Sequence, residues 1–149
     1  MRSGFKVLLT VFIIVTLGIC TARPLSYKPV YSGDGWEIDV IAEVRRVVDG
    51  DTFDSFPVGR VRLADINAPE LGTPGGEASK RALEYLVGKY GSKVYLDVDD
   101  LYVKDRYNRI VAVVYLRFNS THILNVNEWL VENCYAAIDD YYNEFNPYT

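Results

Sequence analysis

The chain contains few of the residues that disulfide frameworks and histidine chemistry require. Its 149 residues include two cysteines and one histidine, His122. His122 lies outside every motif described below, so a histidine-based hydrolytic mechanism is not expected. Cys20 lies in the predicted targeting segment, and if that segment is cleaved off, Cys134 is left alone. No intramolecular disulfide would then form, and the fold would depend on packing for its stability.

Positive charge is scarce, and the end of the chain has none. No lysine or arginine follows Arg117, whereas five acidic residues do. The formal net charge is −4, and it becomes −6 without residues 1–22, which carry two basic residues and no acidic one. A general nucleic-acid coat is therefore not expected, because sequence-independent affinity for phosphates needs many basic contacts. An enzyme that concentrates a few arginines and a cation in one cleft is compatible with this charge.

The sequence also lacks a hydrophobic run of the about 20 residues that a membrane span usually needs. Its apolar stretch runs from Val7 to Cys20, follows two basic residues and ends in a sequence that resembles a cleavage site. This pattern predicts a targeting segment over residues 1–22, either a cleaved signal peptide or a retained membrane anchor. We expect an exported protein, secreted or at the cell surface, that contacts a membrane only if residues 5–22 stay uncleaved.

The rest of the chain has the length and composition of one compact domain. Hydrophobic residues make up 49% of the sequence, which allows a core to form. Prolines, glycines and serines occur without periodicity after the targeting segment, so residues 23–40 are predicted to be a linker or extension. Residues 41–149 are predicted to form the domain, as a monomer.

Regular hydrophobic patterning begins at Ile41 and predicts five strands and two helices. The expected strands are Ile41–Val48, Thr52–Phe56, Arg60–Ile66, Lys93–Val98 and Ile110–Leu116. The expected helices are Glu77–Tyr90, after a flexible loop Leu71–Gly76, and Val126–Asn133, which Asn125 caps. This order predicts a mainly β, α+β fold: a five-stranded OB-fold Greek-key barrel with two flanking helices, after the apolar targeting segment.

Three polar clusters carry the candidate chemistry. Asp49-Gly50-Asp51-Thr52 places two carboxylates in a glycine turn, which suits a hard cation such as calcium or is a plain turn. Arg62 can grip a phosphate and Glu70 can activate water, or the two can form a surface ion pair. The stretch 105–109 places two more arginines in a polar hairpin tip, or in a solvated turn.

Together and in this order, the clusters resemble the staphylococcal nuclease (thermonuclease) family. The resemblance extends from residue 43 to about residue 142 and rests on five segments: VVDGDT (47–52), RLADINAPE (62–70), GGEAS (75–79), DRYNR (105–109) and VNEWLV (126–131). It implies the same five-stranded barrel and a calcium-dependent nuclease. It also implies that Asp51, Asn67 and Ala68 bind one calcium ion, that Arg62, Glu70 and Arg109 are catalytic, and that Arg106, Tyr107 and Tyr142 contact the substrate.

Asn67 departs from the pattern that the resemblance implies, because it stands where a second carboxylate is expected. An amide oxygen carries no charge, so calcium should bind more weakly than with two carboxylates. Asp65 or Asp49 could compensate for this loss. The family's last, lysine-rich helix is also replaced by an acidic tail, which should lower the affinity for long polyanions.

The resemblance implies hydrolysis of phosphodiester bonds in DNA or RNA by water that Glu70 activates, without a covalent intermediate. Two other hypotheses stand beside it. One is a catalytically weak OB-fold module that binds nucleic acid or protein at the cell surface. The other is a structural cell-surface domain whose tyrosine-rich tail meets a partner.

Overall fold

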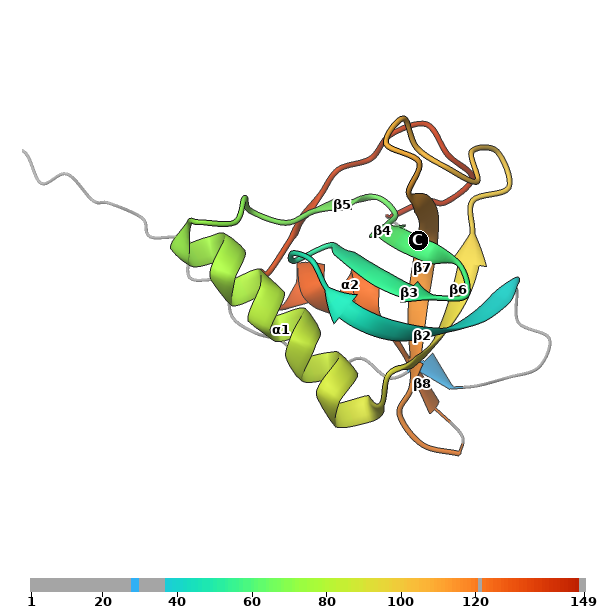
Figure 1. Cartoon of the computed structure of the whole chain (residues 1–149), viewed down its shortest axis with the longest axis horizontal. Helices are drawn as coiled ribbons and strands as arrows, with labels where there is room; N and C mark the ends of the chain where they lie inside the picture. The colour runs from blue at the N-terminus through green and yellow to red at the C-terminus, as the bar shows by residue number, and fades with distance from the viewer. Residues whose placement is uncertain (1–27, 30–36, 121, 148–149) are drawn as a thin grey trace, which may run out of the picture.

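The computed structural model describes residues 28–29, 37–120 and 122–147, whose arrangement is shown in Figure 1. The predicted targeting segment and most of the predicted linker lie outside the described residues. Two linker residues form the short strand β1 (Lys28–Pro29). Among the helices of the described part, none has the length and apolar character that a membrane crossing requires.

Five strands close into a barrel (Figure 1). The strands β2 (Val40–Val47), β3 (Thr52–Phe56) and β4 (Gly59–Leu63) form an antiparallel meander. β6 (Lys93–Val98) pairs antiparallel with β2 on one side and with β7 (Ile110–Arg117) on the other. A parallel pairing of β7 with β4 completes the ring. The structure therefore confirms the predicted five-stranded OB-fold barrel and the α+β class.

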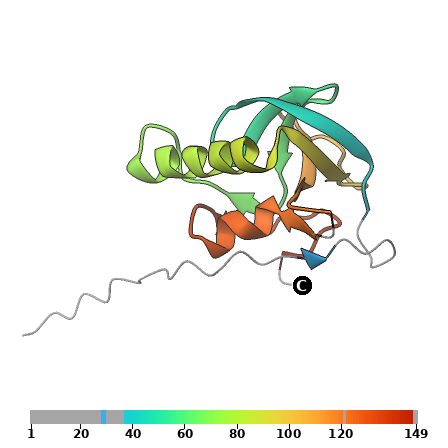
Figure 2. The ribbon, with the colours of Figure 1, turned by 90° about the horizontal axis from the view of Figure 1, so that it is seen from below.

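Two helices cover one side of the barrel. Figure 2 shows α1 (Pro74–Tyr90) and α2 (Val126–Glu132) side by side on that side. Both helices are amphipathic, and their apolar faces meet side chains that the strands send inward. β7 is buried along nearly its whole length because it lines the barrel and also lies against α2. The largest fully buried side chains of this core include Phe53, Leu63, Leu83, Leu86, Leu96, Leu116 and Leu130.

The third predicted strand, Arg60–Ile66, is interrupted. β4 ends at Leu63, and Asp65 adopts a left-handed φ of 54° before the short strand β5 (Ile66–Asn67). Aspartate is one of the few residues with a side chain that visit this region readily. The turn directs the chain away from the barrel and toward β9 (Ala137–Ile138), which pairs with β5.

The first helix begins earlier than predicted, because α1 starts at Pro74, inside the stretch expected to be a flexible loop. Thr73 caps it: its Oγ1 accepts the N–H of Gly76 at 3.0 Å. Proline at the start of a helix lacks only an N–H that would have no helical partner. The cap therefore outweighs the two glycines that favoured a loop.

Two further features lie outside the predicted pattern. The strand β8 (His122–Asn125) was not predicted; it pairs with β7 and with β1. Its last residue caps α2 as predicted, since Asn125 Oδ1 accepts the N–H of Glu128 at 3.1 Å. Cys134, just after α2, is disulfide-bonded in the full-length chain. The expectation of an unpaired Cys134 applies to a chain that has lost residues 1–22, and it stays a prediction.

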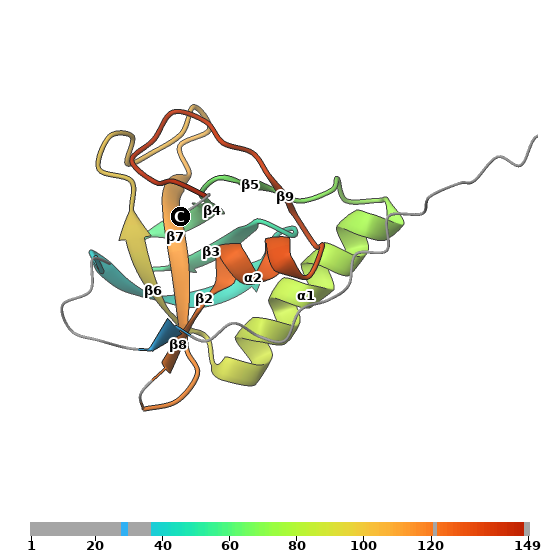
Figure 3. The ribbon, with the colours of Figure 1, turned by 180° about the vertical axis from the view of Figure 1, so that it is seen from behind.

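Residues 139–147, here called the C-terminal strap, cross one end of the barrel. Asp139 N donates to Asp65 O at 2.9 Å, and Asp100 N donates to Glu144 Oε1 at 2.8 Å. Figures 1 and 3 show the strap, in red, beside β5 and the β6–β7 loop. The last residues of the described chain are therefore held next to the loops that carry the predicted site.

Asn127 joins α2 to the barrel wall. Its side chain is buried; Oδ1 accepts the N–H of Val114 at 3.1 Å, and Nδ2 donates to Ala64 O at 2.9 Å and to Ala112 O at 3.3 Å. Val114 and Ala112 lie on β7, and Ala64 directly follows β4. One amide thus satisfies main-chain groups at the point where β4 and β7 diverge.

Replacing Asn127 by alanine should lower the free energy of unfolding by about 2–4 kcal/mol, because buried main-chain groups lose their partner. Urea unfolding measures this loss. Asn133→Ala removes one hydrogen bond, from a half-buried amide to Trp129 O, and should cost about 1 kcal/mol or less. Equal losses in the two variants would contradict the structural role of Asn127.

Asp97 on β6 has an unusual environment. Burial, followed by the charges of Asp39, Glu144 and Glu37, raises its pKa from 3.8 to about 7. At pH values between 3.8 and about 7, Asp97 is protonated in the folded chain but largely ionised in the unfolded chain. The free energy of unfolding therefore falls as the pH rises through this range.

Asp97→Asn should therefore raise the melting temperature at pH 8, where the wild-type carboxylate is charged in the folded state. The difference should shrink as the pH falls toward 4, because Asp97 is then protonated. Thermal unfolding followed by circular dichroism, in the presence of a chelator, measures both curves. Parallel curves for the two proteins across this range would refute the assignment.

Candidate active site

Separate stretches of the sequence meet at one end of the barrel. Thr52 at the start of β3 pairs with Arg62 near the end of β4, and Arg62 pairs with Val111 near the start of β7. Asp51 precedes Thr52, and Arg109 lies two residues before Val111. The strand register therefore places the predicted metal carboxylate and both predicted phosphate-binding arginines at or next to the adjoining ends of three neighbouring strands.

Asp51 is the buried anion of this cluster, with 6% of its surface exposed. Its Oδ2 accepts the N–H of Ala68 at 2.7 Å and lies 3.4 Å from Arg62 Nη2, and its Oδ1 accepts the Thr52 hydroxyl at 3.0 Å. Burial raises the pKa of Asp51; the Arg62 charge and the Ala68 N–H oppose this rise, and the Asp49 charge adds to it. A cation at this position would complement the charge that Arg62 alone does not balance.

The turn before Asp51 is packed against α1. A Cβ on Gly50 would lie 2.0 Å from Ser79 Oγ and 2.6 Å from Ala68 Cβ, so glycine is required by space. Asp49 Oδ1 accepts the N–H of Asp51 at 3.1 Å, which holds the turn from within. Asp49-Gly50-Asp51-Thr52 therefore forms a turn, one of the two alternatives considered. Gly50 and Asp51 are nevertheless buried, and Asp51 contacts Ala68 and Arg62.

Arg62 lies inside this cluster, with 8% of its surface exposed. Its Nη1 donates to Leu63 O at 2.7 Å, and its Nη2 donates to Asn67 Oδ1 at 3.4 Å. The alternative of a surface ion pair with Glu70 is wrong, since the ion-pair partner of Arg62 is the buried Asp51. These contacts hold the guanidinium in one orientation, which favours bidentate recognition of an anion.

Arg109 is held by the polar hairpin tip before β7. Its Nε and Nη2 each lie 2.7 Å from Asp105 Oδ2, and its Nη1 donates to Thr52 Oγ1 at 3.4 Å. Burial alone would raise the pKa of Asp105, but hydrogen bonds from the main chain and guanidinium of Arg109 and from Tyr107 N lower it below its ordinary value. Asp105 is therefore charged at neutral pH, and the tip is an ordered turn and not a loosely solvated one.

Thr52 links the two halves of the site. Its hydroxyl donates to Asp51 and accepts from Arg109, so a chain of contacts runs from Asp105 through Arg109, Thr52 and Asp51 to Arg62. Thr52 belonged to the VVDGDT motif, but nothing in the sequence indicated this bridging role. Only the register of β3 against β4 and β7 brings its hydroxyl between the two arginines.

Glu70 differs from the other predicted residues because its side chain is exposed. Within the described part of the chain, its carboxylate has no hydrogen bond or ion pair. Its main chain is held tightly: Glu70 O accepts the Thr73 hydroxyl at 2.7 Å, and a Cβ on Gly76 would lie 2.1 Å from the same oxygen. A carboxylate on a fixed main chain and free of partners is available to accept a proton from water.

The predicted calcium ligands are partly assembled. Asp51 and the main chain of Ala68 are hydrogen-bonded, and the Asn67 amide oxygen approaches the guanidinium that pairs with Asp51. Carboxylate, amide and carbonyl oxygens are the donors that calcium prefers, so these residues fit the ion in kind. Across residues 37–120 and 122–147, no three acidic, histidine or cysteine side chains form a metal-binding group. Of the two carboxylates that could compensate for Asn67, Asp65 accepts a hydrogen bond from Asn143 on the strap through one oxygen, and its other oxygen has no hydrogen-bond partner among the described residues.

The predicted substrate contacts divide into two groups. The Tyr107 ring contacts both Arg106 and Arg109, with 4.8 Å and 5.3 Å from the ring centroid to their Cζ atoms, so these three side chains are together. Tyr142 lies on the strap, 78% exposed, with its ring centroid 6.0 Å from that of Tyr102. The structure gives no contact between Tyr142 and the arginines, and its role stays a prediction.

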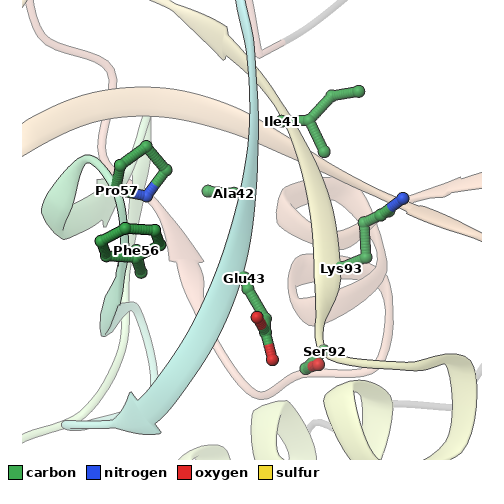
Figure 4. Close-up of a pocket in the computed structure, with 7 residues that line it drawn as sticks. All are labelled: Ile41, Ala42, Glu43, Phe56, Pro57, Ser92 and Lys93. Carbon is green, nitrogen blue, oxygen red and sulfur yellow. The ribbon is translucent and has the colours of Figure 1, made fainter.

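A surface pocket elsewhere on the barrel is distinct from this cluster. Figure 4 shows it against the outer side of β2, near the end of β3 that is opposite Thr52. Its lining is largely apolar, with one carboxylate and one ammonium group, and contains no predicted site residue. The lining residues are Ile41, Ala42, Glu43, Phe56, Pro57, Ser92 and Lys93.

Known proteins share much of this chain. Residues 60–149 match the family described as "Staphylococcal nuclease homologue". A "Micrococcal nuclease" of Shigella flexneri is 34% identical over 113 residues, which cover 71% of this chain and 62% of that protein. An "Uncharacterized endonuclease" of Escherichia coli is 35% identical over 109 residues, or 70% of this chain and 65% of that protein. "Protein ParB" of Escherichia coli is 41% identical over 78 residues, which cover 50% and 41% of the two chains.

The fold and the cluster define a class: a small OB-fold protein whose barrel end presents two arginines and a buried carboxylate. The family match covers more than half of the sequence, and the chain belongs to the staphylococcal nuclease homologue family. The matched region includes Arg62, Glu70 and Arg109 but begins after Asp51. The barrel fold brings Asp51 into contact with Arg62 and Ala68, which lie inside the matched region. The chain spans less than two thirds of the length of the relatives named above.

Two glycines of α1 offer a matched test of how Glu70 is held. Gly76→Ala should lower the free energy of unfolding by about 2 kcal/mol or more, because its Cβ would lie 2.1 Å from Glu70 O. Gly88 has open space around its Cβ position, so Gly88→Ala should stabilise the helix by about 0.5–1 kcal/mol. Urea unfolding of both variants gives the comparison, and opposite signs are expected. A neutral Gly76→Ala would show that the Glu70 loop is not constrained by α1.

Proposed function

We propose that this chain is a calcium-dependent nuclease that hydrolyses phosphodiester bonds of DNA or RNA by attack of water. One observation supports it most: Arg62 pairs with the buried carboxylate of Asp51, and Arg109 reaches the same carboxylate through the Thr52 hydroxyl. Glu70, two residues after Ala68, carries an exposed carboxylate that is available as a base. Relatives described as a nuclease and an endonuclease support the same class of reaction.

Arg62 and Arg109 are suited to the phosphate. Each is oriented by carboxylates, Asp51 and Asp105, so little ordering remains when an anion binds. Their positive charges would stabilise the additional negative charge that develops on the phosphoryl oxygens in the transition state. Tyr107, whose ring contacts both Arg106 and Arg109, would restrict how a nucleotide approaches from the hairpin side.

Glu70 would orient the attacking water and accept its proton. Its carboxylate is exposed and unpaired within the described chain, while its main chain is fixed by Thr73. Asp51, Asn67 and Ala68 would hold the calcium ion, which when bound supplies positive charge to a phosphate oxygen. The water oxygen would form a bond to phosphorus as the bond to the leaving oxygen breaks, and the leaving oxygen would take up a proton from solvent. Because water attacks phosphorus directly, no covalent enzyme intermediate is needed.

The substrate would reach this site by charge focusing and not by overall attraction. The chain carries a formal net charge of −4, and the strap contributes Asp139, Asp140 and Glu144. Arg62 and Arg109 are paired with Asp51 and Asp105, so a bound calcium ion together with Arg106 would add the positive charge that can raise the local concentration of a phosphate ester. We also propose that the protein acts outside the cell as a monomer, with residues 1–22 as signal or anchor.

Cleavage of single-stranded DNA and RNA by the purified protein, with calcium or with chelator, tests the proposal. Glu70→Gln and Arg109→Ala should each lower the rate by at least about 100-fold, because one removes the base and the other a charge-stabilising group. Glu84→Gln and Arg81→Ala, both exposed on α1, are matched controls that should keep the wild-type rate. Equal binding of nucleic acid by all forms, with no cleavage by any, would instead establish a binding module.

A further inference from the structure

A second group of arginines lies on the outer face of the β2–β3–β4 meander. β4 sends Arg60 and Arg62 to the same face, because side chains two residues apart along a strand point the same way. Asp54 on β3 pairs with Arg60 on one side and with Arg46 of β2 on the other. Arg46, Asp54 and Arg60 therefore form one row across three strands, here called the outer row. The neighbouring row on the same face holds Thr52 and Arg62.

A bulge in β2 brings a further arginine to this face. The pairing of β2 with β3 shifts between Val44 and Arg46, so Arg45 is an extra residue without a partner on β3. Arg45 and Arg46 are both exposed, whereas strict alternation would turn one of them toward the core. The bulge thus directs two successive guanidiniums to the outside of the barrel.

The two guanidiniums of the outer row share one carboxylate. Arg60 Nε donates to Asp54 Oδ1 at 2.7 Å and Arg60 Nη2 donates to Asp54 Oδ2 at 3.2 Å, while Arg46 Nη2 donates to the same Oδ2 at 2.5 Å. The hydrogen bond from Arg60, and then that from Arg46, hold the pKa of Asp54 below its ordinary value against the opposing effect of burial. Asp54 is therefore charged at neutral pH, and two positive charges with one negative charge leave the row positive.

The outer row is open to solvent. The side chains of Arg46 and Arg60 are 63% and 46% exposed, against 28% for Asp54. Exposed ion pairs of this kind add little to stability, so stability alone does not account for two arginines on one carboxylate. The carboxylate orients both guanidiniums and leaves their other N–H groups for an anion, as Asp51 and Asp105 do for the arginines of the proposed active site.

An exposed aromatic ring continues the same face. Phe56 lies two residues beyond Asp54 on β3 and is 64% exposed, and Arg45 Cζ lies 5.7 Å from its ring centroid. Figure 4 shows the ring beside Pro57, at the surface pocket. Guanidiniums together with an exposed ring are typical of surfaces that bind a single nucleic-acid strand, with phosphates on the cations and a base stacked on the ring.

We propose that Arg46, Arg60 and Phe56 extend the active site and bind the nucleic-acid strand beyond the scissile bond. The inference rests on the proposed function, in which Arg62 binds the scissile phosphate. The step from Arg62 to Arg60 along β4 is roughly 6.5–7 Å, which is close to the spacing of successive phosphates in an extended strand. The outer row would therefore bind the phosphate next to the scissile one, and Phe56, one step further, would stack on a base.

Binding of a fluorescent single-stranded oligonucleotide of about twelve nucleotides, followed by anisotropy in the presence of a chelator, tests the extension without cleavage. Arg46→Ala/Arg60→Ala should weaken binding about tenfold, because charge-assisted hydrogen bonds to one phosphate are lost. The slope of log affinity against log salt concentration should become shallower by about 0.7, the value for one phosphate of a single strand. Arg60→Ala alone, in which Arg46 still neutralises Asp54, should weaken binding in the same way and serves if the double variant does not fold.

Arg81→Ala/Lys89→Ala is the matched control, because it removes the same charge from two exposed side chains of α1. It should keep the wild-type affinity. An equal loss of affinity in this control would show diffuse attraction to basic side chains and overturn the proposal. Unchanged binding in the outer-row variants, or no binding by the wild-type protein, would overturn it as well.

Cleavage kinetics distinguish a failure of this inference from a failure of the proposed function. With the same oligonucleotide and calcium, Arg46→Ala/Arg60→Ala should raise KM about tenfold and leave kcat unchanged, because the outer row touches no reacting atom. A dinucleotide with one phosphodiester bond has no phosphate for the outer row, so its KM and kcat should keep their wild-type values. A lower kcat with both substrates would overturn the extension. No cleavage by the wild-type protein would refute the proposed function, and the anisotropy measurement would still decide whether the outer row binds nucleic acid.

Discussion

The parallel pairing of β4 with β7 is the contact on which the rest of this structure depends. It closes an otherwise antiparallel ring, and its register places Arg62 beside Val111, hence beside the segment that carries Arg109. Hydrogen bonds of Asn127 to Ala64, Ala112 and Val114 reinforce the seam from α2. Without this pairing the two arginines, 47 positions apart in the chain, would have no reason to meet.

The acidic side chains at this end of the barrel fall into two sets, one paired with arginines and one hydrogen-bonded to the strap. On one side, Asp51 and Asp105 orient Arg62 and Arg109, so the anions are already paired with the cations that a phosphate would need. On the other side, Asp65 and Asp99 hold the strap by hydrogen bonds and have no basic partner among the described residues. The strap carboxylates face main-chain and amide donors, so they are separate from the anions that orient the two arginines.

Hydrophobic periodicity and caps were sufficient to predict most of the elements. The alternation in β6, the β-branched run in β7 and the Asn125 cap all depend on neighbouring residues, and the structure confirms them. The break at Asp65, the strand β8 and the early start of α1 were not predicted. In the first two cases the chain follows partners distant in sequence, β9 for β5 and β7 for β8, and local patterning carries no information about them.

The sequence by itself determined the barrel class, the family and the identity of the candidate site residues, because those depend on residue types in a fixed order. Tertiary structure alone decided that Arg62 pairs with Asp51 and not with Glu70, that Thr52 bridges Asp51 and Arg109, and that Asp65 accepts a hydrogen bond from Asn143 on the strap. The physical reason is that hydrogen bonds and ion pairs depend on distances of about 3 Å between side chains. Strand register and burial set those distances, and neither is a property of any short segment.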